Sequence, residues 1–300
     1  MFSISGTSWV IQDLEAVIFD KDGTIADIHL YWGEIVRRRA RAVIAHWQLA
    51  ESLFPQICGA MGLSLAENRL LPQGPVGLAS RDEIIQILCG HLVGCGVSPS
   101  TKTMAGLFNQ VHEAFLPHIE DYLRIIPGVV TFVASLRQAG ARLAVVTSDT
   151  AINARHSLEK FGISACFDVV VGRDTIPEPK TSGVPALKAL KEMGRSSDKA
   201  VCVGDAPMDF LMAKASSCRA GIAVATGQTP ISRLLQLTPY TADSMGELVA
   251  NISDYSGSIG IPACAHPFGE HQRDAHVPNR PNRQDACSTA RPKHHENQNP

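Results

Sequence analysis

Residues 16–24, "AVIFDKDGT", decide the fold of this chain. They join four apolar residues to Asp20 and Asp22, two aspartates with one residue between them. A short apolar run bounded by turn residues is typical of a strand that is buried on both faces of a sheet. "DKDGT" alone would also suit a type I turn, in which Asp and Gly occupy preferred positions. The other motifs of the chain are therefore needed to distinguish a turn from a functional site.

Four further β-branched runs predict more strands of the same kind. They are "RLAVVT" at 142–147, "FDVVV" at 167–171, "AVCVGD" at 200–205 and "GIAVAT" at 221–226. Helical patterns separate these runs, and "PGVVTFVASLRQAG" shows the usual Pro near the start and Gly at the end. The alternation predicts an α/β fold with a doubly wound, Rossmann-like parallel sheet, formed by residues 14–27 and 126–250.

Residues 28–125 lack this alternation and predict a helical insertion between the first two strands. Asp27 is expected to be the N-cap of its first helix. Ser80 and Ser64 each precede a glutamate by three residues, Glu83 and Glu67, which is the spacing of a capping box. We therefore expect helices to begin at both serines, in a second small domain. Residues 254–300 have no apolar periodicity and predict a disordered tail.

The composition describes a globular chain that needs no disulfide or structural metal. Its 300 residues are 45% apolar and 19% charged, with a net charge of −2. This balance argues against a nucleic-acid partner or an anionic membrane surface. No apolar run approaches the ~20 residues of a membrane span. The eight cysteines form no CxxC pair, and the first residues lack a basic leader pattern, so a cytoplasmic protein is expected.

Polar side chains gather where the predicted strands end. Asp20, Thr147 and Asp205 end three of the runs, and Lys180 and Asp209 follow shortly after strand ends. Ligands of parallel sheets bind at this carboxyl edge. Two carboxylates 4 Å apart repel by roughly 4 kcal/mol at an effective dielectric constant of about 20. A divalent cation and a lysine would offset that repulsion, and a phosphate dianion needs the same groups.

The order of these motifs is specific. A strand followed by D-x-D-G-T is matched at residues 20–24, and a strand followed by G-D-x-x-x-D is matched by Asp205 and Asp209. Between them lie a strand that ends in Thr147 and the later Lys180. In this order the motifs resemble those of the haloacid dehalogenase-like (HAD) hydrolase superfamily, in the branch similar to phosphoglycolate phosphatase. The resemblance implies a helical cap formed by the insertion.

The resemblance also implies roles for the aspartates. Asp20 would attack phosphorus and form an aspartyl-phosphate, and Asp22 would act as general acid and then as general base. Mg²⁺ would be held by Asp20, by the main-chain carbonyl of Asp22 and by Asp205, with Asp209 supporting that shell or the lysine. Asp22 is lacking in dehalogenases, so its presence implies an alcohol leaving group.

Phosphoryl oxygens would be held by Thr147, its neighbour Ser148 and Lys180. Relatives usually follow this lysine with prolines, whereas Lys180 is followed by "TSG". Lys188 and Lys191 are alternatives, but both lie within a helical pattern, where solvent exposure is expected. Lys180 is therefore the favoured residue.

The predicted function is that of a Mg²⁺-dependent phosphatase whose partner is a small phosphorylated metabolite, either phosphoglycolate-like or a sugar phosphate. One alternative is a phosphomutase of the β-phosphoglucomutase type, which would use the same aspartates under a cap that excludes water. The other is a non-catalytic binding module with the same fold. The intact aspartates argue against the module, because repelling carboxylates are costly without chemistry.

Several residues of the insertion allow two alternative roles. His29, Tyr31 and Trp32 lie at its first junction and would either contact substrate or pack the linker. Arg81 would either hold an anionic substrate or lie in a solvated first turn. The "RRRAR" run at 37–41 is expected to form a solvated helix face.

Overall fold

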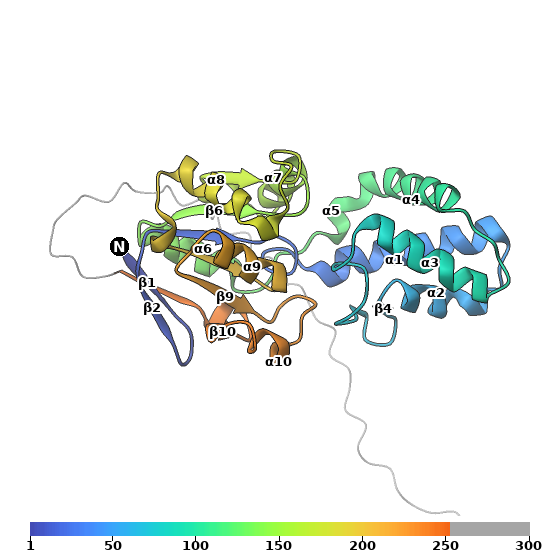
Figure 1. The fold of residues 1–300 in the computed structure, drawn as a ribbon, viewed down its shortest axis with the longest axis horizontal. Helices are drawn as coiled ribbons and strands as arrows, with labels where there is room; N and C mark the ends of the chain where they lie inside the picture. Colours follow the sequence, from blue (N-terminus) through green and yellow to red (C-terminus); the bar gives the residue numbers. More distant parts are fainter. Residues whose placement is uncertain (253–300) are drawn as a thin grey trace, which may run out of the picture. The chain divides into compact units, whose positions relative to one another are not determined.

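The computed structural model describes residues 1–252, and a parallel sheet flanked by helices forms the part of them outside the helical insertion (Figure 1). Within these residues the sheet has six strands in the order β10-β9-β8-β3-β6-β7, and every neighbouring pair is parallel. The strands are β3 Ala16–Phe19, β6 Arg142–Val146, β7 Val169–Val171, β8 Ala200–Gly204, β9 Ala220–Val224 and β10 Thr241–Ala242. The α/β prediction is confirmed, and the sequence runs correspond to all of these strands except the two-residue β10.

Alternate residues of β3 enter two different hydrophobic clusters, which explains why its sequence is apolar throughout. Val17 and Phe19 pack in one cluster with helices α6 and α7, whereas Ala16 and Ile18 pack in another with α8 and α9. Both faces of the strand are thus covered, as a buried parallel sheet requires. The helices that follow the insertion are α6 Val129–Gln138, α7 Ala151–Lys160, α8 Val184–Met193, α9 Pro207–Ala215 and α10 Ile231–Leu234.

The first residues of the chain form a second, antiparallel sheet that the sequence did not reveal. Strand β1 (Phe2–Ser5) pairs with β2 (Val10–Leu14) on one side and with β11 (Val249–Ile252) on the other. The inward side chains of β1 are 0–1% exposed and belong to the cluster that covers α6. The predicted core began at residue 14, so it omitted two strands that complete it.

The helical insertion follows β3 and has a hydrophobic cluster of its own. Its helices and hairpin strands are α1 Ile28–Trp47, α2 Phe54–Ala60, β4 Leu63–Ser64, β5 Arg69–Leu70, α3 Arg81–Gly94, α4 Thr101–Phe115 and α5 Ile119–Tyr122. Short 3₁₀ turns in the described chain are η1 Glu51–Leu53, η2 Leu116–His118, η3 Ser164–Cys166, η4 Lys180–Ser182, η5 Ser197–Lys199 and η6 Met245–Glu247. None of the helices in residues 1–252 has the length and apolar content to cross a bilayer.

Two of the three expected helix caps are present. Asp27 accepts hydrogen bonds from the main-chain amides of His29 and Leu30 in α1, and Ser80 forms a capping box with Glu83 at the start of α3. The prediction at Ser64 was wrong, because Ser64 ends strand β4. Its hydroxyl accepts a hydrogen bond from the amide of Glu67 inside the hairpin turn, so the same local contact closes a turn instead of a helix.

The expected solvated face at 37–41 was also partly wrong. Arg39 is buried, at 8% exposed, and its guanidinium carbon lies 4.0 Å from the centre of the Phe108 ring. The division into a core (14–27 and 126–250) and a cap (28–125) stays a prediction, because the described residues form one compact unit. The predicted tail, 254–300, lies outside the described residues.

The contribution of the N-terminal sheet can be measured at β1. We expect Phe2→Ala to lower the free energy of unfolding by about 3–5 kcal/mol, because it opens a cavity in a closed part of the core. Val10→Ala on β2, where the side chain is 55% exposed, should change it by less than about 0.5 kcal/mol. Urea unfolding of both variants tests this, and equal midpoints would contradict it.

Candidate active site

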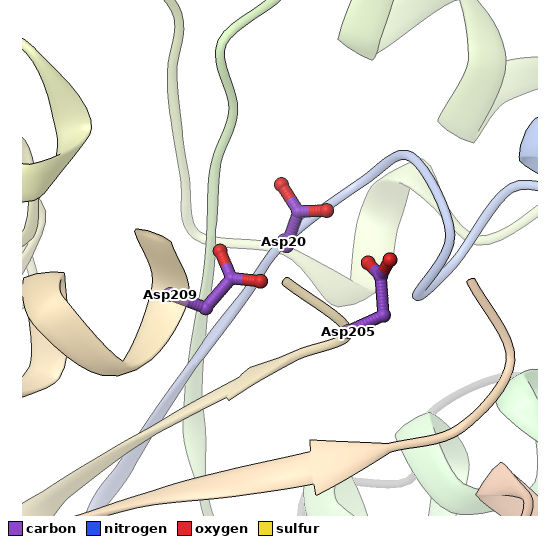
Figure 2. Close-up of side chains that lie close together, drawn as sticks. All are labelled: Asp20, Asp205 and Asp209. Carbon is purple, nitrogen blue, oxygen red and sulfur yellow. The ribbon is translucent and has the colours of Figure 1, made fainter. Parts of the chain in front are cut away.

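Three aspartates meet at the carboxyl edge of the parallel sheet (Figure 2). Asp20 follows β3, Asp205 follows β8, and Asp209 lies in the first turn of α9. Strands β3 and β8 are neighbours with Phe19 opposite Val203, so their last residues bring Asp20 and Asp205 together. One carboxylate oxygen from each aspartate lies within 4.8 Å of the others, and all three residues are buried.

A buried lysine pairs with this cluster. Lys180 begins η4, and its Nζ lies 2.6 Å from Oδ1 of Asp20 and 2.5 Å from Oδ1 of Asp209. Burial alone would lower the pKa of Lys180, but the two carboxylates outweigh it and raise that pKa. Of the alternatives, Lys188 pairs with Glu192 on α8, and Lys191 is exposed. The structure therefore brings Lys180, the favoured lysine, to the aspartates.

The turn after β3 is shaped around Asp205. Thr24 donates a hydrogen bond from its hydroxyl to Oδ1 of Asp205 at 3.0 Å. Gly23 has φ +91°, and a Cβ there would come within 2.5 Å of the Asp205 carboxylate. A Cβ on Gly227, in the loop after β9, would overlap the same carboxylate. "DGT" therefore forms a turn that packs against a carboxylate of the acidic cluster, and its catalytic role stays a prediction.

The site carries more negative than positive charge. One lysine faces three carboxylates, and burial, followed by the charges of Asp20 and Asp209, raises the pKa of Asp205 well above its usual range. Clustered carboxylate oxygens are ligands that suit a hard divalent cation such as Mg²⁺. The donor set therefore fits the predicted metal.

The side chain of Asp22 lies outside the carboxylate cluster. Its Oδ1 is 2.7 Å from Nζ of Lys21, and the same Nζ lies 3.1 Å from Asp149. Burial raises the pKa of the Asp22 carboxyl, while Lys21 acts in the opposite direction. The arrangement suits the expectation that Asp22 offers its carbonyl, rather than its carboxylate, to a metal.

Lys21 and Asp149 were missed by the sequence reasoning. Lys21 is the residue between the two motif aspartates, and Asp149 comes two residues after Thr147. Both positions lie within recognised motifs, so a search for charges beside each motif residue would have found them. The buried position of Lys21, at 3% exposed, distinguishes it from a solvated lysine.

The predicted phosphoryl-binding residues lie beside this cluster. Thr147 is buried after β6, and its hydroxyl accepts a hydrogen bond from the amide of Asp149 at 3.1 Å. Ser148 is exposed, with its hydroxyl 3.8 Å from the sulfur of Met208. Thr147, Ser148 and Lys180 line one cavity of about 270 Å³. Lys180 connects this space with the cluster, because it lines the cavity and also contacts Asp20 and Asp209.

Comparison with known proteins agrees with this geometry. The family model described as "haloacid dehalogenase-like hydrolase" matches residues 14–217, which is more than half of the chain. The chain belongs to this HAD-like hydrolase family. The matched span includes every residue of the buried cluster, so the family resemblance seen in the motifs is confirmed.

Individual HAD relatives show how far the similarity extends. "Probable phosphatase IndB" of Dickeya dadantii is 28% identical over 235 residues, which are 78% of this chain and 91% of the relative. A phosphoglycolate phosphatase of Caulobacter vibrioides is 28% identical over 177 residues, 58% of this chain and 74% of the relative. A crystal structure described as a "predicted phosphoglycolate phosphatase", from Haemophilus somnus, superimposes with a TM-score of 0.61 at 18% identity, covering 79% of this chain and 97% of that one. That likeness confirms the HAD fold.

Charge balance in the cluster predicts the effect of removing Lys180. In buffer without Mg²⁺, Lys180→Met should lower the free energy of unfolding by about 3–5 kcal/mol, because buried carboxylates lose their cation. Added Mg²⁺ should recover part of this loss. Lys188→Met, on the exposed face of α8, is the control and should change stability by less than about 0.5 kcal/mol. Identical denaturation curves for the two variants would show that Lys180 does not balance the site.

Proposed function

We propose that this HAD hydrolase is a Mg²⁺-dependent phosphatase that acts on a small phosphorylated metabolite. The observation that carries the proposal is the buried cluster of Asp20, Asp205 and Asp209 around Lys180. A second acid, Asp22, lies two residues from Asp20 with its carboxylate turned to another lysine. Relatives named as phosphatases support the same reaction class.

The proposed metal ligands are carboxylate oxygens of Asp20 and Asp205 and the main-chain carbonyl of Asp22, with Asp209 behind them. Bound Mg²⁺ would neutralise negative charge that otherwise repels a phosphate dianion. Asp209 is fixed independently of any ion, because its Oδ2 accepts a hydrogen bond from the amide of Ala206 at 3.0 Å. Lys180 holds the nucleophilic Asp20 in place through its 2.6 Å contact.

In the first proposed step, a carboxylate oxygen of Asp20 attacks phosphorus and the bond to the leaving oxygen breaks. That oxygen takes a proton from Asp22, whose pKa is raised by burial in spite of Lys21. In the second step Asp22 accepts a proton from a water molecule that attacks the aspartyl-phosphate, and Asp20 is released with inorganic phosphate. Thr147, Ser148 and Lys180 would hold the phosphoryl oxygens through both steps.

The helical insertion would cover the substrate and exclude bulk water. Side chains tie it to the loop after β9. His29 of α1 has its Nε2 3.2 Å from the carbonyl oxygen of Gly227, and the Gln228 amide donates to the carbonyl of Gly74 at 2.9 Å. These contacts support the proposal that residues 28–125 act as a cap over the catalytic core.

Substitutions of the two aspartates of the opening motif should block different steps of the proposed reaction. Asp20→Asn removes the nucleophile, so turnover should vanish and no phosphoenzyme should form. Asp22→Ala retains the nucleophile but lacks the base of the second step. With an aryl phosphate, whose leaving group needs no proton, it should accumulate aspartyl-phosphate. Intact-mass measurement after acid quench reads both outcomes, and near wild-type turnover by Asp20→Asn would refute the covalent mechanism.

Metal dependence gives a separate test. Phosphate release should stop in EDTA and return with Mg²⁺, and Asp205→Asn should need a much higher Mg²⁺ concentration for half-maximal rate. Thr226→Ser, beside Gly227 in the loop after β9, keeps the hydroxyl that donates to Gly23 and serves as control. Full activity in EDTA would contradict the metal proposal. A sugar phosphate that is isomerised without phosphate release would instead indicate a mutase.

A further inference from the structure

Two cysteines beside the parallel sheet lie in contact, and the proposed catalytic steps use neither of them. Cys202 is on β8, and Cys218 follows α9 in the turn before β9. Both are free thiols, and Sγ of Cys202 lies 3.8 Å from Sγ of Cys218. The amide of Cys218 donates to the carbonyl of Ala213 in α9 at 2.9 Å, and the next amide, of Arg219, donates to Ala200 in β8 at 2.8 Å. Main-chain hydrogen bonds to both elements therefore hold Cys218 beside Cys202.

The two thiols differ in their access to solvent. Cys202 is buried, at 1% exposed, and packs in the hydrophobic cluster between the sheet and helices α8 and α9. Cys218 is half-buried at the edge of the same cluster and lines a cavity of about 590 Å³. A small molecule can therefore reach the sulfur of Cys218, whereas the sulfur of Cys202 is closed to it.

The contact also gives the two sulfurs different protonation. The Cys202 thiol donates a hydrogen bond to Sγ of Cys218, and this bond lowers the pKa of Cys218 in spite of its partial burial. The same contact, followed by burial, raises the pKa of Cys202 well above its usual range. Because the thiolate is the reactive form of cysteine, Cys218 is the more nucleophilic sulfur and Cys202 keeps its proton.

A buried cysteine by itself is an ordinary packing residue. This pair differs because a reachable sulfur lies in contact with a second, protected one. An oxidised cysteine in that position condenses with its neighbour to a disulfide, which stops further oxidation. The arrangement therefore suits reversible oxidation better than packing alone.

We propose that Cys218 and Cys202 form an oxidation site, at which a hydroperoxide converts the two thiols into a reversible disulfide. In the first step Sγ of Cys218 attacks a peroxide oxygen. A sulfur–oxygen bond forms, the oxygen–oxygen bond breaks, and the released oxygen takes the proton lost by Cys218 and leaves as water or an alcohol. In the second step Sγ of Cys202 attacks the sulfenic acid of Cys218. The sulfur–sulfur bond forms, and the hydroxide leaves as water with the proton of Cys202.

The disulfide would close a loop around part of the acidic cluster. Residues 203–217 lie between the two cysteines, and they include α9 together with Asp205 and Asp209. A cross-link at the ends of this segment restrains its local opening. Oxidation would thus act on two of the three clustered aspartates without contacting them. The inference does not depend on the phosphatase proposal.

Peptide mapping of the full chain tests the site directly. Trypsin separates the two cysteines because it cleaves after Lys214, which leaves Cys202 in residues 200–214 and Cys218 in residues 215–219. After treatment with hydrogen peroxide and blocking of free thiols, wild type should yield these two peptides joined, with the loss of two hydrogen atoms. Dithiothreitol should separate them again. Two free thiols, oxidation of Cys218 to a sulfinic acid without the cross-link, or a cross-link to a third cysteine overturns the proposal.

Single variants test the order of the two steps. In Cys202→Ala the sulfenic acid of Cys218 has no partner, so dimedone should label it during peroxide treatment. In Cys218→Ser the buried Cys202 should stay reduced. Cys95→Ser, which replaces another half-buried cysteine, is the matched control and should form the cross-link as wild type does. Oxidation of Cys202 in Cys218→Ser, or no dimedone label on Cys218 in Cys202→Ala, overturns the assigned order.

Amide hydrogen exchange measures the restraint on the acidic cluster. In the purified disulfide form, residues 203–217 should exchange at least about threefold more slowly than in the reduced protein. Peroxide-treated Cys218→Ser should match its untreated form. Equal or faster exchange of this segment in the disulfide form would show that the cross-link does not restrain Asp205 and Asp209.

Discussion

The contact of Lys180 with Asp20 and Asp209 is the interaction on which the site depends. Parallel pairing of β3 with β8 places acidic residues at the same sheet edge, and their repulsion grows as the helices exclude water. Lys180, from the loop after β7, reduces this repulsion by pairing with Asp20 and Asp209. The surplus negative charge that remains is then available to attract a cation.

The sequence predicted strands correctly where a run of apolar residues indicated burial on both faces. The runs that became β3, β6, β7, β8 and β9 were visible because both faces of each strand are covered, and the motif residues were visible because each follows such a run. Strand β10 has only two residues, too few for a pattern. Strand β1 alternates, but over only four residues, and β2 alternates imperfectly because polar Gln12 and Asp13 are both exposed.

Side-chain partners were less accessible to sequence reasoning than backbone elements. The pairing of Lys21 with Asp149 spans more than a hundred residues and depends on the register of β3 with β6. Arg39 resembled the other arginines of its run in the sequence, and its burial depends on the packing of α4 on α1, where it contacts Phe108. Ser64 shows the converse limit, because one local hydrogen bond serves both a helix start and a hairpin turn.

The loop after β9 touches two parts of the molecule through consecutive residues. Gly227 packs against the carboxylate of Asp205, while its carbonyl contacts His29, and Gln228 reaches the main chain at Gly74. Because Gly227 and Gln228 are consecutive, the loop connects the insertion directly to one carboxylate of the acidic cluster. A displacement of the insertion that moves His29 or Gln228 also moves Gly227, which packs against the Asp205 carboxylate. Under the cap role proposed for residues 28–125, access for substrate would be coupled to the geometry of the acidic cluster.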